Sequence, residues 1–220
     1  TVKHINGMIP QEWISETEEL ILNSKNITIL KNTLVTTYNF TNHLIALEDK
    51  FAGKKIDLNK SELTLHKIRT SNTIIANGHI ERFISFRNND LPGVMLASSF
   101  EKYIHRYGVV PEKEPVIFTN NSSSLSLLKK LISLGCKPKA YVDSRKKDNI
   151  ETEIKKILKD KEIPFFSDAE IEGCDGNKKV ETITIRQGKS FDKIKSSMLC
   201  VSGGYNPDIH LFTQSKGLVK

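Results

Sequence analysis

The sequence predicts an α/β protein built around a parallel sheet, and two features carry this prediction. An apolar run at 116–119 is followed by a helix-forming segment at 122–134 and by a second apolar run at 140–143. Short apolar runs without alternation are typical of strands covered on both faces, and this order is typical of a βαβ unit. A further apolar run at 198–201, which ends in a glycine-rich turn, has the same character.

The length and composition are those of a globular protein with one or two domains. The chain has 220 residues, of which 38% are hydrophobic and 27% charged, and each of two domains could bury its own core. No apolar run approaches the ~20 residues of a membrane span. The start, Thr1-Val2-Lys3-His4, shows neither an initiating Met nor a signal-peptide pattern. We therefore expect an internal segment of a longer polypeptide.

Charge and cysteine usage exclude several classes of function. The net charge of +7 comes mainly from lysines scattered along expected helix surfaces and loops. A nucleic-acid interface would concentrate that charge on one face with aromatic or arginine side chains, so we predict a solvated surface and no nucleic-acid partner. The cysteines Cys136, Cys174 and Cys200 form no CxxC motif and no metal-ligand spacing, so each is expected to be a small buried hydrophobe. So few cysteines suit a cytoplasmic protein, with no metal site and no dithiol centre.

The N-terminal third predicts a helix followed by a β-meander. Pro10 suits a first helical turn, and apolar residues at helical spacing continue to about Asn23. Thr41-Asn42 is a plausible hairpin turn between two strands. The segment 73–76 is apolar without alternation, which predicts a strand covered on both faces. The expected strands are 27–30, 34–40, 43–48, 62–69 and 73–76.

The rest of the chain alternates helical and strand-like segments. A helix is expected over 93–107, with Gly108 at its C-terminus, and Gly135 is expected to close the helix of the βαβ unit. The charged, proline-bounded segment 111–115 is the best candidate for a domain boundary. The remaining expected elements are a helix over 148–161 and strands at 164–166, 169–171 and 180–185.

The turn after the strand 116–119 is a candidate second nucleotide site. A dinucleotide-binding fold normally opens with G-x-G-x-x-G, but the chain contains no such run, and asparagines and serines stand in its place here. Backbone N–H groups at a helix N-terminus still form a generic anion site, and Asp143 ends the next strand at the spacing of a ribose-binding carboxylate. The candidate residues are Asn120, Asn121, Ser122 and Asp143. The absence of glycines favours the alternative, a scaffold that has lost its site and in which Ser122 only caps its helix.

Two other turns would allow a ligand to approach the backbone. The strand-like segment 74–76 runs into Asn77-Gly78-His79, and the strand at 198–201 runs into Ser202-Gly203-Gly204. His79 and His210 lie in or near these turns, where a hydrogen-bonded structural role is the more common one. No nucleophile and no carboxylate pair stands out, so no catalytic residue is predicted.

Several motifs, taken in order, resemble the α subunit family of heterotetrameric sarcosine oxidase. These are the run RNNDLPGVMLA at 87–97, the run YGV at 107–109, the run VIFTNN at 116–121 and the run VSGGYNP at 201–207. The resemblance spans nearly the whole chain.

The resemblance implies the FAD/NAD(P)-binding, disulfide-reductase-like architecture. In this architecture a Rossmann domain is interrupted by an inserted second Rossmann-like domain. We expect 1–111 and 198–220 to form a partial FAD/NAD-binding domain with a β-meander, and 112–197 to form the inserted, pyridine nucleotide-type domain. The resemblance implies that the first βαβ unit, with its phosphate-binding loop, would lie upstream of Thr1, so we expect this chain to lack it.

The family also implies a function for the parent complex. Sarcosine oxidases of this kind demethylate sarcosine oxidatively to glycine, form peroxide and pass the one-carbon unit to tetrahydrofolate. The α subunit is expected to carry NAD, with FAD as the alternative, and FMN and FAD lie elsewhere in a complex with β, γ and δ subunits. The isolated segment is expected to be inactive and to bind cofactor poorly or not at all.

By resemblance, two groups of residues would line the dinucleotide. Val35 would give backbone contacts to the adenine, and Ala76, Asn77 and Gly78 would form the turn beside the cofactor. The other side would be lined by Ser202, Gly203, Gly204, Asn206 and Pro207. The family usually has Ala-Thr-Gly-Ala where this chain has Ala76-Asn77-Gly78-His79, which puts the identity of the cofactor in question. The alternatives are a related opine or amine oxidase subunit and a non-catalytic assembly module.

Overall fold

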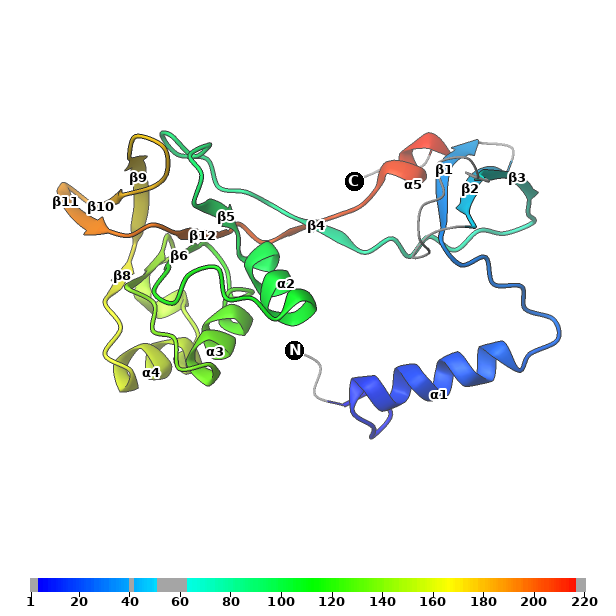
Figure 1. Cartoon of the computed structure of the whole chain (residues 1–220), viewed down its shortest axis with the longest axis horizontal. Helices are drawn as coiled ribbons and strands as arrows, with labels where there is room; N and C mark the ends of the chain where they lie inside the picture. The colour runs from blue at the N-terminus through cyan, green and yellow to red at the C-terminus, as the bar shows by residue number, and fades with distance from the viewer. Residues whose placement is uncertain (1–3, 40–41, 51–62, 217–220) are drawn as a thin grey trace. The chain divides into compact units, whose positions relative to one another are not determined.

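The computed structural model describes residues 4–39, 42–50 and 63–216, which form two compact units (Figure 1). Unit 1 consists of Thr1–Gly78 and Asp208–Lys220, and unit 2 of His79–Pro207. The chain therefore enters unit 2 after Gly78 and leaves it after Pro207.

Unit 1 is built on an antiparallel β-meander. Strands β1 (Thr33–Asn39), β2 (His43–Asp49) and β3 (Leu63–Arg69) pair in chain order. Helix α1 (Pro10–Leu22) precedes them, and helix α5 (His210–Gln214) returns to β1, where Gln214 Oε1 accepts a hydrogen bond of 2.9 Å from Tyr38 N. The predicted first helix and the three strands of the meander are confirmed. Thr41 of the predicted hairpin turn lies outside the described residues, and Asn42 has a φ of 56°.

Two predicted strands of unit 1 are wrong. The segments 27–30 and 73–76 have no regular structure, and Ile74 is 94% exposed. A strand with both faces covered needs a neighbouring strand on each edge and a layer above and below. The described residues of unit 1 supply neither to Ile74, so its apolar side chain stays outside any sheet.

Unit 2 contains the predicted parallel sheet. Its strand order is β5-β12-β6-β7-β8, and all four pairings are parallel. Every residue of β6, β7 and β12 is buried, as the apolar runs predicted. The strands are β5 (Val94–Leu96), β6 (Val116–Thr119), β7 (Ala140–Asp143), β8 (Phe165–Ser167) and β12 (Leu199–Ser202).

The two faces of this sheet are covered by different layers (Figure 1). Ile117, Tyr141 and Cys200 point to one face and pack against helices α2 (Ala97–Tyr107), α3 (Leu125–Ser133) and α4 (Thr152–Asp160). On the other face, the alternate residues of the same strands pack against an antiparallel sheet. That sheet consists of β9 (Ala169–Asp175), β10 (Thr182–Gln187) and β11 (Ser190–Lys195). Unit 2 is therefore a three-layer helix, sheet, sheet arrangement.

Several expected boundaries shift in unit 2. The helix expected from residue 93 begins at Ala97, because 94–96 form strand β5 beside β12. The helices expected at 122–134 and 148–161 are shorter, and a separate 3₁₀ turn at Lys147–Asn149 precedes α4. Gly108 and Gly135 follow their helices with φ of 66° and 73°, as predicted.

The two compact units divide at residues other than the domain boundaries expected from the sequence. We expected boundaries at 111/112 and 197/198, whereas the compact units divide at 78/79 and 207/208. The reason is that β5 and α2 pack into the same sheet and core as β6 and β12. The first and last elements of unit 2 along the chain are β4 (His79–Glu81) and β13 (Tyr205–Pro207), which pair antiparallel.

Both the backbone conformation and the lack of space at position 93 require a glycine there. Its φ is 107°, and a Cβ placed there would lie 2.4 Å from Ser197 O. We expect Gly93→Ala to lower the free energy of unfolding by about 2–4 kcal/mol. Gly188→Ala is the matched control, because Gly188 also has a positive φ (58°) but open space around it. The control should cost about 1 kcal/mol. Equal losses for the two variants in urea denaturation would contradict this explanation.

Candidate functional site

The carboxyl edge of the parallel sheet is the first candidate site. Strands β6, β7 and β8 follow one another in one direction, whereas β12 and β5 lie on the other side of β6. Ligands of open α/β sheets bind at such a reversal, outside the carboxyl ends of the strands. Here the edge is formed by Thr119 at the end of β6 and Ser202 at the end of β12, which are register partners.

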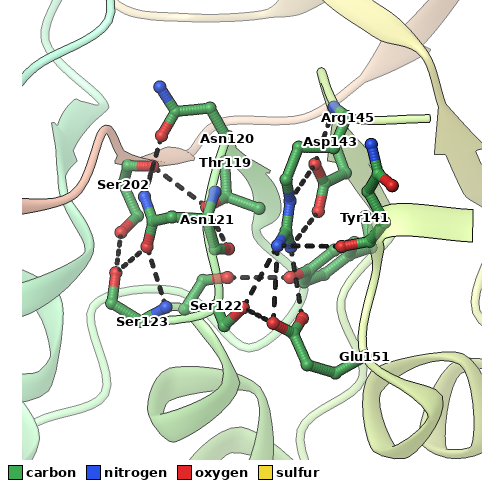
Figure 2. A network of polar contacts seen from close by, with 12 residues as sticks. Thr119, Asn120, Asn121, Ser122, Ser123, Tyr141, Asp143, Arg145, Glu151 and Ser202 are labelled. Atoms are coloured by element: carbon green, nitrogen blue, oxygen red, sulfur yellow. Dashed lines mark hydrogen bonds and ion pairs between the residues drawn. The ribbon is translucent and has the colours of Figure 1, made fainter. Parts of the chain in front are cut away.

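Asn121 organises the turn between β6 and α3 (Figure 2). Its Oδ1 accepts hydrogen bonds from Ser123 N (2.8 Å) and from the Ser123 hydroxyl, and its Nδ2 donates to Ser202 O (3.0 Å). Thr119 Oγ1 donates to the same Ser202 carbonyl at 3.0 Å. The suggestion that Ser122 caps the helix is wrong, since the N-cap residue is Ser124 and Asn121 supplies the side-chain bond to the turn. The Asn121 amide has both an acceptor oxygen and an N–H₂ donor, so it bonds the turn and the end of β12 at the same time.

Asp143 lies at the neighbouring strand end and is completely buried. Its Oδ1 accepts from the Arg145 backbone N at 2.9 Å and from Arg145 Nε at 3.1 Å, and its Oδ2 accepts from Arg145 Nη2 at 2.8 Å. This bidentate pairing raises the pKa of Arg145 above its ordinary value, mainly through the hydrogen bonds to Asp143. The carboxylate that would receive a ribose hydroxyl is therefore fully engaged within the protein.

The same guanidinium links Asp143 to the turn (Figure 2). Arg145 Nη1 donates to Ser122 Oγ at 3.2 Å, and Nη2 lies 3.3 Å from Glu151 Oε2. The Ser122 hydroxyl also contacts the Glu151 carboxylate. Burial acts to raise the pKa of Glu151, but hydrogen bonds from Ser122 and Arg145 outweigh it, so the net shift is downward. Glu151 therefore stays ionised beside Arg145.

The structure brings Asn120, Asn121, Ser122 and Asp143 to one sheet edge, as the spacing suggested. Sequence reasoning missed Arg145 and Glu151, which fill the space beside them. An arginine two residues after the carboxylate was the available signal, because it can fold back onto the strand end. A nucleotide at this edge remains a prediction, and the internal ion pairs favour a closed turn.

A second candidate site is a cavity in unit 1 of about 560 Å³. It brings together Val35, Ala76 and Asn77, three of the predicted cofactor residues. Asn77 Nδ2 donates to Asp208 O at 3.3 Å, and Asp208 N donates to Gly78 O at 3.1 Å. Gly78 has a φ of 78° and open space where a Cβ would lie. The complete lining is Leu34, Val35, Thr36, Leu44, Thr73, Ile74, Ile75, Ala76, Asn77, Asp208, His210, Leu211 and Gln214.

Sequence reasoning missed the contribution of α5 to this cavity. Asp208, His210 and Gln214 come from the far end of the chain, and no local pattern relates them to the β-meander. His210 N donates to Asp208 Oδ1 at 3.2 Å, which fixes the start of the helix.

The predicted residues Ser202, Gly203, Gly204, Asn206 and Pro207 lie in unit 2. A Cβ on Gly203 would lie 2.3 Å from Arg82 O, and Gly203 N donates to that carbonyl at 2.9 Å. The close approach that requires this glycine is therefore made by the protein backbone itself. Asn206 and Pro207 are in β13, opposite β4. Their contact with a cofactor remains a prediction.

The cysteines and the described helices add no further site. Cys136, Cys174 and Cys200 are free and buried, as expected for small hydrophobes, and burial raises the pKa of Cys174 to about 11. Within the described ranges, no group of three or more His, Cys, Asp or Glu side chains could hold a metal ion. Among the described helices, none has the length and apolarity to cross a membrane.

The buried ion pair gives a sharp prediction for stability. Arg145→Met should leave the Asp143 carboxylate buried and uncompensated, and should lower the free energy of unfolding by about 3–5 kcal/mol. Arg186→Met is the matched control, because Arg186 pairs with Glu170 and Glu172 at the surface and should contribute at most about 1 kcal/mol. Chemical denaturation of both variants measures the difference. A loss below 1 kcal/mol for Arg145→Met would contradict the assigned role.

Comparison with curated proteins gives relatives of a single kind. No family model matches the chain. The α subunit of sarcosine oxidase from Rhizobium meliloti (strain 1021) is 29% identical over 210 residues, which cover 94% of this chain and 20% of that protein. The α subunit from Corynebacterium sp. (strain U-96) is 26% identical over 98% of this chain and 23% of its own length. The chain thus spans about a fifth of the length of the curated relatives that it matches.

Comparison with solved structures shows the fold. Thioredoxin reductase from T. acidophilum has a TM-score of 0.66 at 14% identity and covers all of this chain, which covers 67% of it. The NAD-dependent persulfide reductase from A. fulgidus has a TM-score of 0.63 at 16% identity, over 90% of this chain and 36% of its own. The predicted fold class is confirmed. The chain is related over nearly its whole length to part of the sarcosine oxidase α subunit, and it has the α/β fold of FAD- and NAD-dependent disulfide oxidoreductases.

Proposed function

We propose that this chain is a segment of a sarcosine oxidase-type α subunit and contributes part of a dinucleotide-binding site. The parent complex would demethylate sarcosine oxidatively to glycine, form peroxide and transfer the one-carbon unit to tetrahydrofolate. The observation that carries the proposal is the cavity of unit 1. It gathers Val35, Ala76 and Asn77 in a chain related to sarcosine oxidase α subunits.

The cavity has the chemistry that an adenine nucleotide needs. Its volume of about 560 Å³ lies within the usual range for small-molecule sites. Leu34, Val35 and Leu211 supply apolar walls for a flat ring, and the irregular backbone at 73–77 offers N–H and C=O groups that no strand pairing consumes. Asp208 and Gln214 add polar groups at the same cavity. The set suits a base and ribose bound between an apolar wall and exposed backbone.

The departure at Asn77 and His79 is compatible with this role. Asn77 Nδ2 is bonded to Asp208 O, and the His79 ring packs edge-on against Tyr205 with centroids 4.2 Å apart. The two bulky residues are therefore engaged with their own surroundings. We propose NAD as the dinucleotide, with FAD as the alternative. Either would supply hydride-transfer chemistry when bound, whereas the residues described here bind and orient.

The parent complex requires other chains. Relatives named as an α subunit imply further subunits, which we propose to be the β, γ and δ chains with their FMN and FAD. One observation favours a second role for unit 2, namely partner binding without a nucleotide. Arg145 and Glu151 close the turn at which a pyridine nucleotide would bind. A related opine or amine oxidase subunit would share these features and differ in substrate.

Blocking the cavity should remove the dinucleotide. In the complete α chain co-expressed with its partner subunits, Ala76→Trp should fill the cavity and sharply lower the NAD or FAD released on denaturation. Leu65→Trp is the matched control, since Leu65 is 57% exposed on β3 and does not line the cavity. Chromatography of the released nucleotides and sarcosine-dependent peroxide formation are the measurements. Full nucleotide content in Ala76→Trp would refute the proposed site.

The 220-residue chain by itself should bind the dinucleotide weakly. No G-x-G-x-x-G turn is present to hold the pyrophosphate through backbone N–H groups. Titration calorimetry with NAD and with FAD should show no saturation up to about 1 mM. A Kd of 1 mM corresponds to a binding free energy of only about −4 kcal/mol. Micromolar binding by this chain would show that it contains the residues that bind the phosphates.

A further inference from the structure

One face of the β-meander carries a row of polar and cationic side chains. Asn39 on β1, His43 on β2 and Arg69 on β3 are register partners across the three strands. Side chains of directly opposite residues lie on the same face, with Cβ atoms about 5 Å apart. Lys67 lies two residues before Arg69, and therefore on this face as well, beside its register partner Ile45. The strand pairing thus places an amide, an imidazole, a guanidinium and an ammonium group side by side.

These four side chains border a cavity of about 210 Å³, whose lining is completed by Leu44, Ile45 and Ile68. Leu44 and Ile68 alternate with the polar residues along β2 and β3 and point to the opposite face, so their backbone forms the floor of the cavity. The volume lies below the roughly 300–1,000 Å³ of sites that hold a whole small molecule. The cavity therefore suits a single small group and not a nucleotide.

Among the described residues, no carboxylate pairs with Lys67 or Arg69. Glu48 lies on the opposite face, where it pairs with His66 at 2.8 Å. Asp49 lies on the same face as Lys67, but about 13 Å farther along the strands. The two cations are only about 7 Å apart along β3, which is less than the Debye length of about 8 Å at physiological salt, so their fields add. The cavity therefore attracts an anion.

We propose that this cavity binds the phosphate group of inorganic phosphate or of a small phosphate monoester. A phosphate presents acceptor oxygens in several directions. The planar guanidinium of Arg69 can donate two parallel hydrogen bonds to two of these oxygens, and Lys67 adds a compact charge. The amide of Asn39 supplies a neutral N–H donor. The inference goes beyond the proposed function and does not rest on it, since the dinucleotide is assigned to a different cavity.

A second role of cations on β3 leads to a different expectation. The strand lies at the edge of its three-stranded sheet, and lysines on edge strands discourage pairing with other chains. That role needs no cavity, and it needs no polar side chains on the neighbouring strands. It predicts that phosphate does not saturate the face, whereas a phosphate site predicts that it does.

Phosphate titration of the 220-residue chain, followed by amide NMR at constant ionic strength, tests the proposal. The amides of residues 43–45 and 67–69 should shift and saturate, whereas sodium chloride at the same ionic strength should not shift them. Lys67→Gln and Arg69→Gln should each weaken binding by about tenfold or more, because each removes a charged donor. Lys189→Gln is the matched control, since it removes an exposed charge from the β10–β11 turn of unit 2. It should bind phosphate like the unmodified chain.

Three further titrations sharpen the assignment. Arg69→Lys keeps the charge but loses the planar fork, so its affinity should lie between those of the unmodified chain and Arg69→Gln. Glycerol phosphate distinguishes the two sources of the phosphate group: tighter binding than inorganic phosphate identifies a monoester, and weaker or equal binding identifies the free ion. Ala76→Trp, which fills the dinucleotide cavity, should leave phosphate binding unchanged. The failure of one proposal is therefore distinguishable from the failure of the other.

Three outcomes would overturn the proposal. Shifts that rise linearly with phosphate and spread over both units would indicate ionic screening only. Unchanged affinity in both Lys67→Gln and Arg69→Gln would remove these side chains from the site. An equal loss of affinity in Lys189→Gln would show that the net charge of the chain, and not this cavity, attracts the anion. The titration of the unmodified chain decides the first outcome even if a variant fails to fold.

Discussion

The insertion of β12 between β5 and β6 is the pairing on which the rest of unit 2 depends. It joins the last strand of the parallel sheet to strands that lie far earlier in the chain, and it buries every residue of β12. Without it, β5 and α2 would have no connection to the sheet, and the cluster containing Phe100 and Ile104 would lose one wall. The same pairing places Ser202 beside Thr119, so the polar edge of the sheet exists only because this strand is in place.

The polar groups at this edge of the sheet bond to one another. Asn121 binds the turn and the neighbouring strand end at once, and the guanidinium of Arg145 serves a buried carboxylate, a hydroxyl and a second carboxylate. A glycine-rich turn leaves its N–H groups free for phosphate, whereas a turn of asparagines and serines binds its own neighbours. The composition of this turn therefore decides whether its polar groups bind a ligand or form hydrogen bonds within the same chain.

The elements with a clear local signal could be predicted from the sequence. Strands β6, β7 and β12 are short apolar runs, and Gly108 and Gly135 mark helix ends, so both follow from local chemistry. Ile74 could not be placed, because an apolar run does not reveal whether neighbouring strands exist to cover it. Strand β5 was read as part of a helix, since its partner β12 comes from a distant part of the sequence.

The residues of the candidate sites also divide into those that could be identified from the sequence and those that only the fold brings together. Val35, Ala76 and Asn77 were identified through family resemblance, and the cavity brings them together. Arg145 and Glu151 could not be assigned, because their importance arises only when the loop folds back onto Asp143.

The antiparallel pairing of β4 with β13 has a consequence for how the chain folds. His79 and Pro207 are register partners, so the two ends of unit 2 lie about one strand spacing apart. For unit 1, which is split between the two ends of the sequence, a folded unit 2 acts as a short hairpin in place of a long flexible loop. The entropy of closing that loop is then lost within unit 2 and not at the α5–β1 contact. Unit 2 should therefore fold first, and the docking of α5 onto the β-meander should be a late event in the assembly of the chain.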